Sequence, residues 1–208
     1  MDFASSDPRP TRGQAPLPAT VGEGLKIVVV GGFGVGKTTL VRSVSEIRPL
    51  DTEATMTTEG LGIDDLAATP AKTATTVAFD FGRITIDDEH VLYLFGAPGQ
   101  QRFWFLWDRL FLGALGAVVL LDQRRIADSW YAIDRLEHQG TPFVVACNDF
   151  GGTGTTDQVR EALDLDPAVP LITCDARDRE SAKTVLITLV EHLYRAVSAR
   201  AATRETAR

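Results

Sequence analysis

The stretch from Ile27 to Thr39 decides the fold, and it reads I-V-V-V-G-G-F-G-V-G-K-T-T. Its first four residues are apolar, which is typical of a short strand buried on both faces. The next eight residues fit Gly31-x-x-x-x-Gly36-Lys37-Thr38, the P-loop pattern. A polyphosphate needs several backbone N–H groups pointing inward, and glycines leave room for it to approach. The stretch therefore predicts a strand, a phosphate-binding loop and a helix.

A glycine-rich turn between a core strand and a helix is the alternative interpretation. The position of the pattern, directly after an apolar strand, favours nucleotide binding. Lys37 is expected to reach the β- and γ-phosphates and to assist catalysis, and the Thr38 hydroxyl is expected to ligate Mg²⁺. The residues predicted to surround the phosphates are Gly31, Gly32, Phe33, Gly34, Val35, Gly36, Lys37, Thr38 and Thr39.

Length and charge narrow the possible functions. A chain of 208 residues is long enough for one α/β domain and short for two. The net charge of −7 argues against nucleic acid as a partner and gives no general attraction to anionic membranes. No apolar run reaches the length of a membrane span, and no signal peptide is evident. Cys147 and Cys174 are expected to be reduced and buried, in a cytoplasmic protein.

Strands and helices alternate along the chain, which predicts a mostly parallel sheet with helices on both faces. Six strands are expected, one of them antiparallel because a hairpin joins the second and third, at residues 25–30, 75–86, 90–95, 117–121, 142–146 and 170–173. Residues 49–74 show no clear period and are expected to be irregular. The predicted organisation is a disordered proline-rich tail at 1–23, one domain at 24–195, and a frayed Ala/Arg tail at 196–208.

An aromatic-rich segment, expected to be helical up to about Leu112, follows the sequence P-G-Q. Its helical spacing places four residues on one face that suits the core, namely Phe103, Leu106, Trp107 and Leu110. Trp104 and Phe105 lie off that face. They are expected either to pack under the neighbouring helix or to stay exposed for a partner protein.

The order of motifs resembles a small Ras-like GTPase of the bacterial MglA type, and is nearer still to the actinobacterial conservon GTPases (CvnD). The resemblance covers about Leu25 to Tyr194, and four stretches carry it: G-G-F-G-V-G-K-T-T-L, T-T-V-A-F-D-F-G-R-I, L-Y-L-F-G-A-P-G-Q-Q-R-F-W and L-I-T-C-D-A-R-D. It implies an α/β P-loop NTPase G domain. It also implies a molecular switch in bacterial signal transduction that binds GTP or GDP with Mg²⁺ and hydrolyses GTP slowly without a partner.

The resemblance assigns roles around the phosphates. Thr76 resembles the first-switch threonine that binds Mg²⁺, with Thr75 as its rival. Gln100 resembles the glutamine that orients the attacking water, and Gly99 would donate its N–H to the γ-phosphate. Each of these residues also has an ordinary alternative, as a strand threonine or a loop residue.

The resemblance also assigns a base site. Asn148, followed by Asp149, resembles the asparagine that braces the P-loop and touches the base. Ala176, followed by Arg177, resembles the backbone N–H donor to the guanine oxygen. The alternatives are a strand-end cap at Asn148 and a plain turn at D-A-R.

Two positions depart from the Ras pattern. Gly96 stands where the D-x-x-G aspartate would be, so a contact to Mg²⁺ is expected to be missing. Gly151 replaces the aspartate of N-K-x-D, and losing a charge-assisted hydrogen bond of about 1.5–3 kcal/mol weakens guanine preference by roughly 10- to 100-fold or more. Asp149, two residues before Gly151, is the available substitute.

Three functions compete on these residues. The first is a GTP-hydrolysing switch; the second is a module that holds nucleotide without turning it over. The third is a P-loop ATPase or kinase in which Asp122, closing an apolar run, imitates a Walker B aspartate. No intrinsic arginine finger is obvious in the first switch, and Arg83 and Arg102 are its candidates elsewhere.

The resemblance implies protein partners as well. Such GTPases work with roadblock/LC7-type proteins, and the conservon type also works with a sensor-kinase-like membrane protein. We therefore expect a cytoplasmic protein without a direct membrane span that can reach the membrane through a complex.

Overall fold

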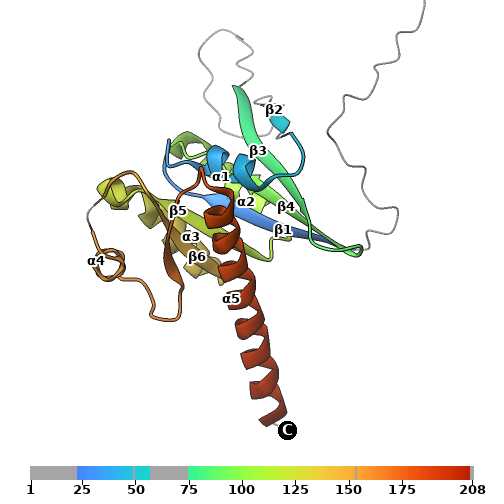
Figure 1. Cartoon of the computed structure of the whole chain (residues 1–208), viewed down its shortest axis with the longest axis vertical. Helices are drawn as coiled ribbons and strands as arrows, with labels where there is room; N and C mark the ends of the chain where they lie inside the picture. The colour runs from blue at the N-terminus through green and yellow to red at the C-terminus, as the bar shows by residue number, and fades with distance from the viewer. Residues whose placement is uncertain (1–22, 49, 57–74, 153, 207–208) are drawn as a thin grey trace, which may run out of the picture.

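The computed structural model describes residues 23–48, 50–56, 75–152 and 154–206 (Figure 1). Seven strands form one sheet in the order β2-β3-β4-β1-β5-β6-β7. The strands are β1 (Glu23–Val30), β2 (Leu50–Met56), β3 (Thr75–Thr85), β4 (His90–Gly96), β5 (Gly116–Leu121), β6 (Phe143–Asn148) and β7 (Leu171–Cys174). The α-helices are α1 (Lys37–Val44), α2 (Trp107–Phe111), α3 (Trp130–Gln139), α4 (Thr156–Ala162) and α5 (Arg179–Thr206), and the 3₁₀ helices are η2 (Gln101–Leu106) and η3 (Gln123–Ser129).

The direction of the strands confirms the predicted fold class. Strand β1 pairs in parallel with β4 and β5, and β6 pairs in parallel with β5 and β7. Within the described sheet only β3 runs against its neighbours, β2 and β4. The carboxyl ends of β1, β4, β5, β6 and β7 therefore meet at one edge, where ligands bind in such sheets.

The sheet has one strand more than predicted. Leu50–Met56 forms β2, which pairs with β3 from Leu50↔Phe81 to Met56↔Thr75, in a segment expected to be irregular. Its sequence, L-D-T-E-A-T-M, alternates as an edge strand does, but threonine and alanine make the alternation weak. The other residues of that segment, 57–74, and residues 1–22 of the tail predicted at 1–23 lie outside the described part of the chain, while Glu23 belongs to β1.

The core is two apolar clusters, one on each face of the sheet. Successive residues of β1 alternate between them: Ile27 and Val29 join the cluster under α1 and α5, and Val28 and Val30 join the one under α2, α3 and α4. This two-sided burial follows from the period of two in a strand and from crossover connections that place helices on both faces. Both cysteines are free and buried, as predicted.

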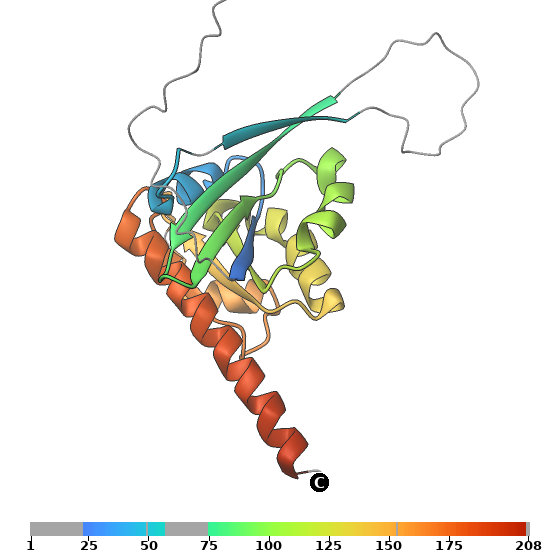
Figure 2. The same cartoon turned by 90° about the vertical axis from the view of Figure 1, so that its right-hand side faces the viewer.

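Several element ends differ from the expectation. Helix α1 ends at Val44, and the Ser45 hydroxyl that follows accepts a hydrogen bond from the Ile47 N–H. Helix α5 continues to Thr206 instead of fraying from residue 196, because alanine and arginine favour a helix even without packing. Figure 2 shows this helix projecting well beyond the sheet.

The aromatic segment after P-G-Q is not one helix. It begins as the 3₁₀ helix η2 and continues as α2. Leu106 and Trp107 are buried as predicted, but Phe103 lines the pocket at the P-loop instead of the core. Trp104 stacks on Tyr131 of α3, with ring centroids 3.6 Å apart, so its packing is the one expected under the neighbouring helix.

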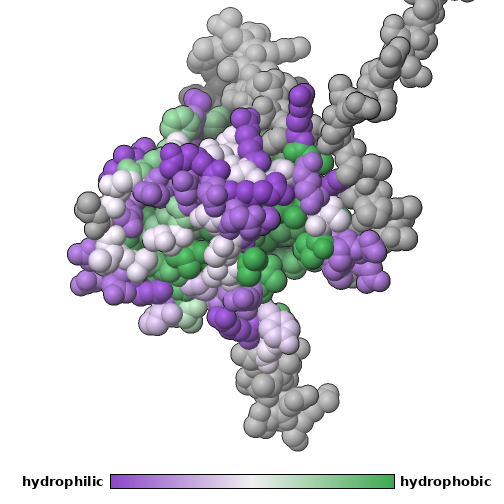
Figure 3. All heavy atoms as spheres, viewed as in Figure 1, coloured by the Kyte–Doolittle hydropathy of each residue, from purple (hydrophilic) through white to green (hydrophobic). Residues whose placement is uncertain are grey.

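Polar side chains cover most of the face in Figure 3, and apolar ones gather beside α5. Among the described helices, none is both long enough and apolar enough to cross a bilayer.

Candidate nucleotide-binding site

The P-loop joins the end of β1 to the start of α1. Gly31 and Gly36 have φ values of 140° and 103°, in the region that favours glycine. A Cβ on Gly31 would come within 2.0 Å of the Leu120 carbonyl oxygen, so no other residue fits there. The loop is therefore pressed onto the sheet, and it leads through Gly36 into the N-terminus of α1, where helix N–H groups are available to bind phosphate.

The side chain of Lys37, the first residue of α1, lies back against this loop. This side chain is buried, and Nζ donates to the carbonyl oxygens of Gly31 and Gly32 at 2.9 and 2.7 Å. Burial lowers the pKa of Lys37 to about 8, and the nearby Asp80 carboxylate opposes that shift. An ammonium group held by two carbonyls can exchange them for phosphate oxygens, which are stronger partners because they are charged.

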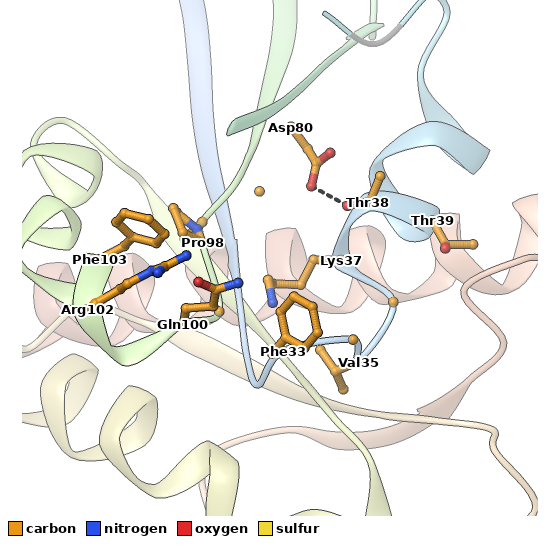
Figure 4. A pocket seen from close by; sticks show the side chains of 15 residues that line it. Phe33, Val35, Lys37, Thr38, Thr39, Asp80, Pro98, Gln100, Arg102 and Phe103 are labelled. Carbon is orange, nitrogen blue, oxygen red and sulfur yellow. Dashed lines mark hydrogen bonds between the residues drawn. The ribbon is translucent and has the colours of Figure 1, made fainter. Parts of the chain in front are cut away.

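Asp80 supplies a carboxylate that sequence analysis missed. The Thr38 hydroxyl donates to Asp80 Oδ2 at 2.6 Å (Figure 4). Asp80 pairs with Gly96 across β3 and β4, and a Cβ on Gly96 would lie 2.8 Å from the Asp80 Cβ. Gly96 itself carries no carboxylate, as the sequence indicated, but Asp80 reaches that space from the adjacent strand and gives Thr38 an acidic neighbour.

A sequence signal for Asp80 existed. The turn at residues 87–89 fixes the hairpin register, and a hairpin centred on Asp88 pairs Asp80 with Gly96. Asp80 is also an acidic residue within an otherwise apolar strand sequence, A-F-D-F.

Gln100 and Gly99 lie beside Lys37. They line a cavity of about 510 Å³ together with Lys37, Thr38 and Asp80. A Cβ on Gly99 would meet Lys37 Nζ at 2.6 Å, so the P-G-Q turn packs directly on the P-loop. In Figure 4 the Gln100 amide points toward Lys37, and Phe33, which is 63% exposed, lines the same cavity.

The remaining phosphate-side predictions are placed as follows. Gly34, Val35 and Thr39 line the same cavity. Thr76 lies in β3 opposite Thr55, on the strand that carries Asp80. Its side chain lies outside the described atoms, so its metal-binding role stays a prediction.

Asn148 ties the P-loop to the end of β7. Its Nδ2 donates to the Val35 carbonyl oxygen at 2.9 Å, and its Oδ1 accepts from the Ala176 N–H at 2.9 Å. The bracing role expected of Asn148 is thus present in the geometry. The Ala176 N–H is bound to Asn148 here, so to reach a base oxygen it would have to exchange partners.

A second cavity, of about 450 Å³, lies next to Asn148. Its lining includes Asp149, Asp175 and Ser181. Asp149 Oδ1 accepts from the Gly151 N–H at 2.9 Å, and Gly151 has a φ of 77°. The Arg177 guanidinium donates two hydrogen bonds to the Asp175 carboxylate, and these lower the pKa of Asp175. The walls therefore offer carboxylate acceptors to a base.

Asp122, the candidate Walker B aspartate, is hydrogen-bonded to Arg124. Its carboxylate accepts from the backbone N–H and the guanidinium of Arg124, and the hydrogen bond to that side chain holds the pKa of Asp122 below its ordinary value. The carboxylate beside Thr38 is that of Asp80, so the role proposed for Asp122 by analogy with Walker B belongs geometrically to Asp80.

The donor set fits Mg²⁺. Thr38 and Asp80 offer oxygen atoms, which this ion prefers. No group of three or more His, Cys, Asp or Glu side chains able to hold a metal occurs among the residues that the structure describes.

The fold and the site define a nucleotide-binding P-loop NTPase with a G-domain architecture. More particularly, the chain belongs to the family described as "Conserved hypothetical ATP binding protein", which matches residues 29–196. The uncharacterised protein MJ1339 of Methanocaldococcus jannaschii is 31% identical over 137 residues, which cover 64% of this chain and 76% of that protein.

Solved G domains share the fold. The FeoB G domain from Methanococcus jannaschii superposes with a TM-score of 0.54 at 12% identity, covering 83% of this chain and 99% of that one. The G domain of the FeoB iron transporter from T. maritima gives 0.56 at 17% identity, covering 82% and 99%. Identities this low show the fold alone.

Proposed function

We propose that this protein is a GTP-hydrolysing molecular switch of the Ras-like class that uses Mg²⁺. One observation carries the proposal: Lys37, the Thr38–Asp80 pair and Gln100 line one cavity over the P-loop. These are the groups that phosphoryl transfer requires, namely a cation for the phosphates, oxygen ligands for a metal and an amide to position water.

The chain's own groups divide the work. Lys37 would leave the carbonyls of Gly31 and Gly32 and donate to phosphate oxygens. Thr38, aligned by its hydrogen bond to Asp80, would hold Mg²⁺, which when bound neutralises charge on the phosphates. Gln100 would orient the attacking water, while the Gly99 N–H donates to the γ-phosphate.

The structure weakens the argument for a module that only stores nucleotide. The absence of an aspartate at Gly96 favours such a module, but Asp80 places a carboxylate beside Gly96 and Thr38. The ATPase alternative needs Asp122 as its Walker B aspartate, but the Asp122 carboxylate is hydrogen-bonded to the Arg124 guanidinium. The family's description nevertheless mentions ATP, so the base is the sharper question.

We propose guanine as the base, with discrimination weaker than a complete N-K-x-D motif gives. Asn148 stands at the expected place, and Asp149 puts a carboxylate on the wall of the adjoining cavity. The Asp149 carboxylate is already engaged with the Gly151 N–H, and it lies two residues before the usual position. Both facts argue for a moderate preference.

The switch would act through partners. By resemblance to the MglA and conservon GTPases, these are a roadblock-type protein and a sensor-kinase-like membrane protein. The second would bring the chain to the membrane periphery.

The proposed function is tested by the nucleotide that copurifies and by competition. Labelled GTP bound to the protein with Mg²⁺ is challenged with unlabelled GTP, ATP, ITP and XTP, and hydrolysis of the bound nucleotide is followed by chromatography. We expect GDP or GTP to copurify, a preference for GTP over ATP of at least about tenfold, and slow multiple turnover. A clear preference for ATP would replace the switch with an ATPase.

Replacing Gln100 with alanine should slow hydrolysis by at least about tenfold and leave GTP affinity within a few-fold, because water positioning acts mainly in the transition state. Single-turnover rates and equilibrium titrations of the same preparation separate the two effects. Equal single-turnover rates for the parent and the variant would remove Gln100 from the mechanism.

A further inference from the structure

Two adjacent arginines after β5 point to different parts of the site. Arg124 binds Asp122 and lies over the Phe150 ring, 5.0 Å from its centroid. Arg125 interrupts η3 with a non-helical backbone (φ −140°, ψ 46°) and turns toward the P-loop. Its Nη1 donates to the Phe33 carbonyl oxygen at 3.4 Å.

A third cavity joins Arg125 to Gln100. It measures about 440 Å³, and its lining includes both of these side chains together with Gly32 and Gly99. It therefore adjoins the P-loop beside Lys37, where the γ-phosphate is expected. The cavity gives the Arg125 side chain open space beside the groups that would surround the reacting phosphate.

Arg125 forms an ion pair with Asp128. Arg125 Nη2 lies 2.5 Å from Asp128 Oδ2, and the two side chains are 56% and 38% exposed. Such exposed pairs contribute about 0–1 kcal/mol, so a phosphate with more charge can outcompete the carboxylate. Asp128 is itself fixed on the P-loop, since a Cβ on Gly32 would lie 2.8 Å from the Asp128 Cβ.

The two arginines that the sequence offers for this role, Arg83 and Arg102, lie in other surroundings. Arg83 is buried in β3 opposite Tyr93. Arg102 borders the phosphate cavity but lies over the Phe103 ring, 4.8 Å from its centroid.

We propose that Arg125 is an intrinsic catalytic arginine that donates hydrogen bonds to the γ-phosphate as hydrolysis proceeds. The inference rests on the proposed GTPase function. Water oxygen bonds to the γ-phosphorus, the bond from that phosphorus to the β–γ bridging oxygen breaks, and its electron pair stays on the GDP oxygen. The water proton passes to phosphate or solvent. Arg125 keeps its proton and stabilises the charge on the transferring group, as a supplied arginine does.

The test compares Arg125→Gln with the parent in single-turnover hydrolysis of preloaded GTP·Mg²⁺. We expect a rate at least about tenfold lower, with GTP affinity within about threefold, because the contact forms in the transition state. Arg125→Lys should recover only part of the rate, because lysine lacks the planar fork. Arg109→Gln, an exposed arginine on α2, controls for the loss of one positive charge.

A transition-state mimic separates the possible failures. The GDP-loaded parent should bind aluminium fluoride without a partner protein, and Arg125→Gln should not. If the parent binds no guanine nucleotide, the proposed function itself fails. If it binds GTP but hydrolyses it equally fast in both forms, or if Arg102→Gln rather than Arg125→Gln slows it, the function stands and Arg125 is not the catalytic arginine.

Discussion

Replacing Lys37 with alanine is expected to lower the affinity for GTP·Mg²⁺ by at least about a hundredfold. Two charge-assisted hydrogen bonds to phosphate, at about 1.5–3 kcal/mol each, would be lost. The folded chain should tolerate the change, because alanine is favourable at the first position of α1 and the substitution removes a buried charge.

A titration with a fluorescent GTP analogue measures the loss, and a melting curve without nucleotide shows whether the fold survives. Lys183→Ala is the matched control, since Lys183 lies on α5 in a surface pair with Glu180. Unchanged affinity of Lys37→Ala for both GTP and ATP would show that this loop is not the nucleotide site.

The second large effect is expected from removing the Asp80 carboxylate on β3 and from placing one at Gly96 on β4. Asp80→Ala should lower Mg²⁺-dependent GTP binding by at least about tenfold, because Thr38 loses the acceptor that aligns it, a hydrogen bond to a charged group worth about 1.5–3 kcal/mol. Gly96→Asp alone should destabilise the fold, because its new side chain would meet that of Asp80.

Combining Asp80→Ala with Gly96→Asp removes the clash and places one carboxylate on β4. The double variant is expected to regain most of the Mg²⁺-dependent binding that Asp80→Ala loses. Titrations with and without Mg²⁺, made on the parent and the three variants, give a complete double-mutant cycle. Additive losses in the double variant would mean that a carboxylate on Gly96 cannot take over the role of Asp80.

The pattern at residues 27–39 was sufficient to predict the phosphate loop, because few local arrangements satisfy that spacing, and the alternation of strands and helices along the chain predicted the parallel sheet. It was insufficient for β2, whose weak alternation only becomes a strand through pairing with β3. The site was incomplete for the same reason: Asp80 matters through its neighbour across the hairpin, and a motif read along one strand does not show that neighbour.

The base side shows a different limit. Asn148 and D-A-R were assigned by resemblance to a family of GTPases, and the structure brings them together through a hydrogen bond. The Asp149 carboxylate accepts a hydrogen bond from the Gly151 N–H because the backbone turns at Gly151. The spacing of residues in the sequence does not predict that hydrogen bond.

The pKa of about 8 at Lys37 links nucleotide exchange to protons. Near that pH the empty site holds a mixture of the charged and neutral amine, whereas bound phosphate favours the charged form. Loading therefore takes up protons from the medium, and release returns them. Affinity should fall as the pH rises above about 8, since neutral amines must first be protonated. Lys37 therefore makes nucleotide affinity depend on pH, while the protons taken up on loading and returned on release balance over a full cycle.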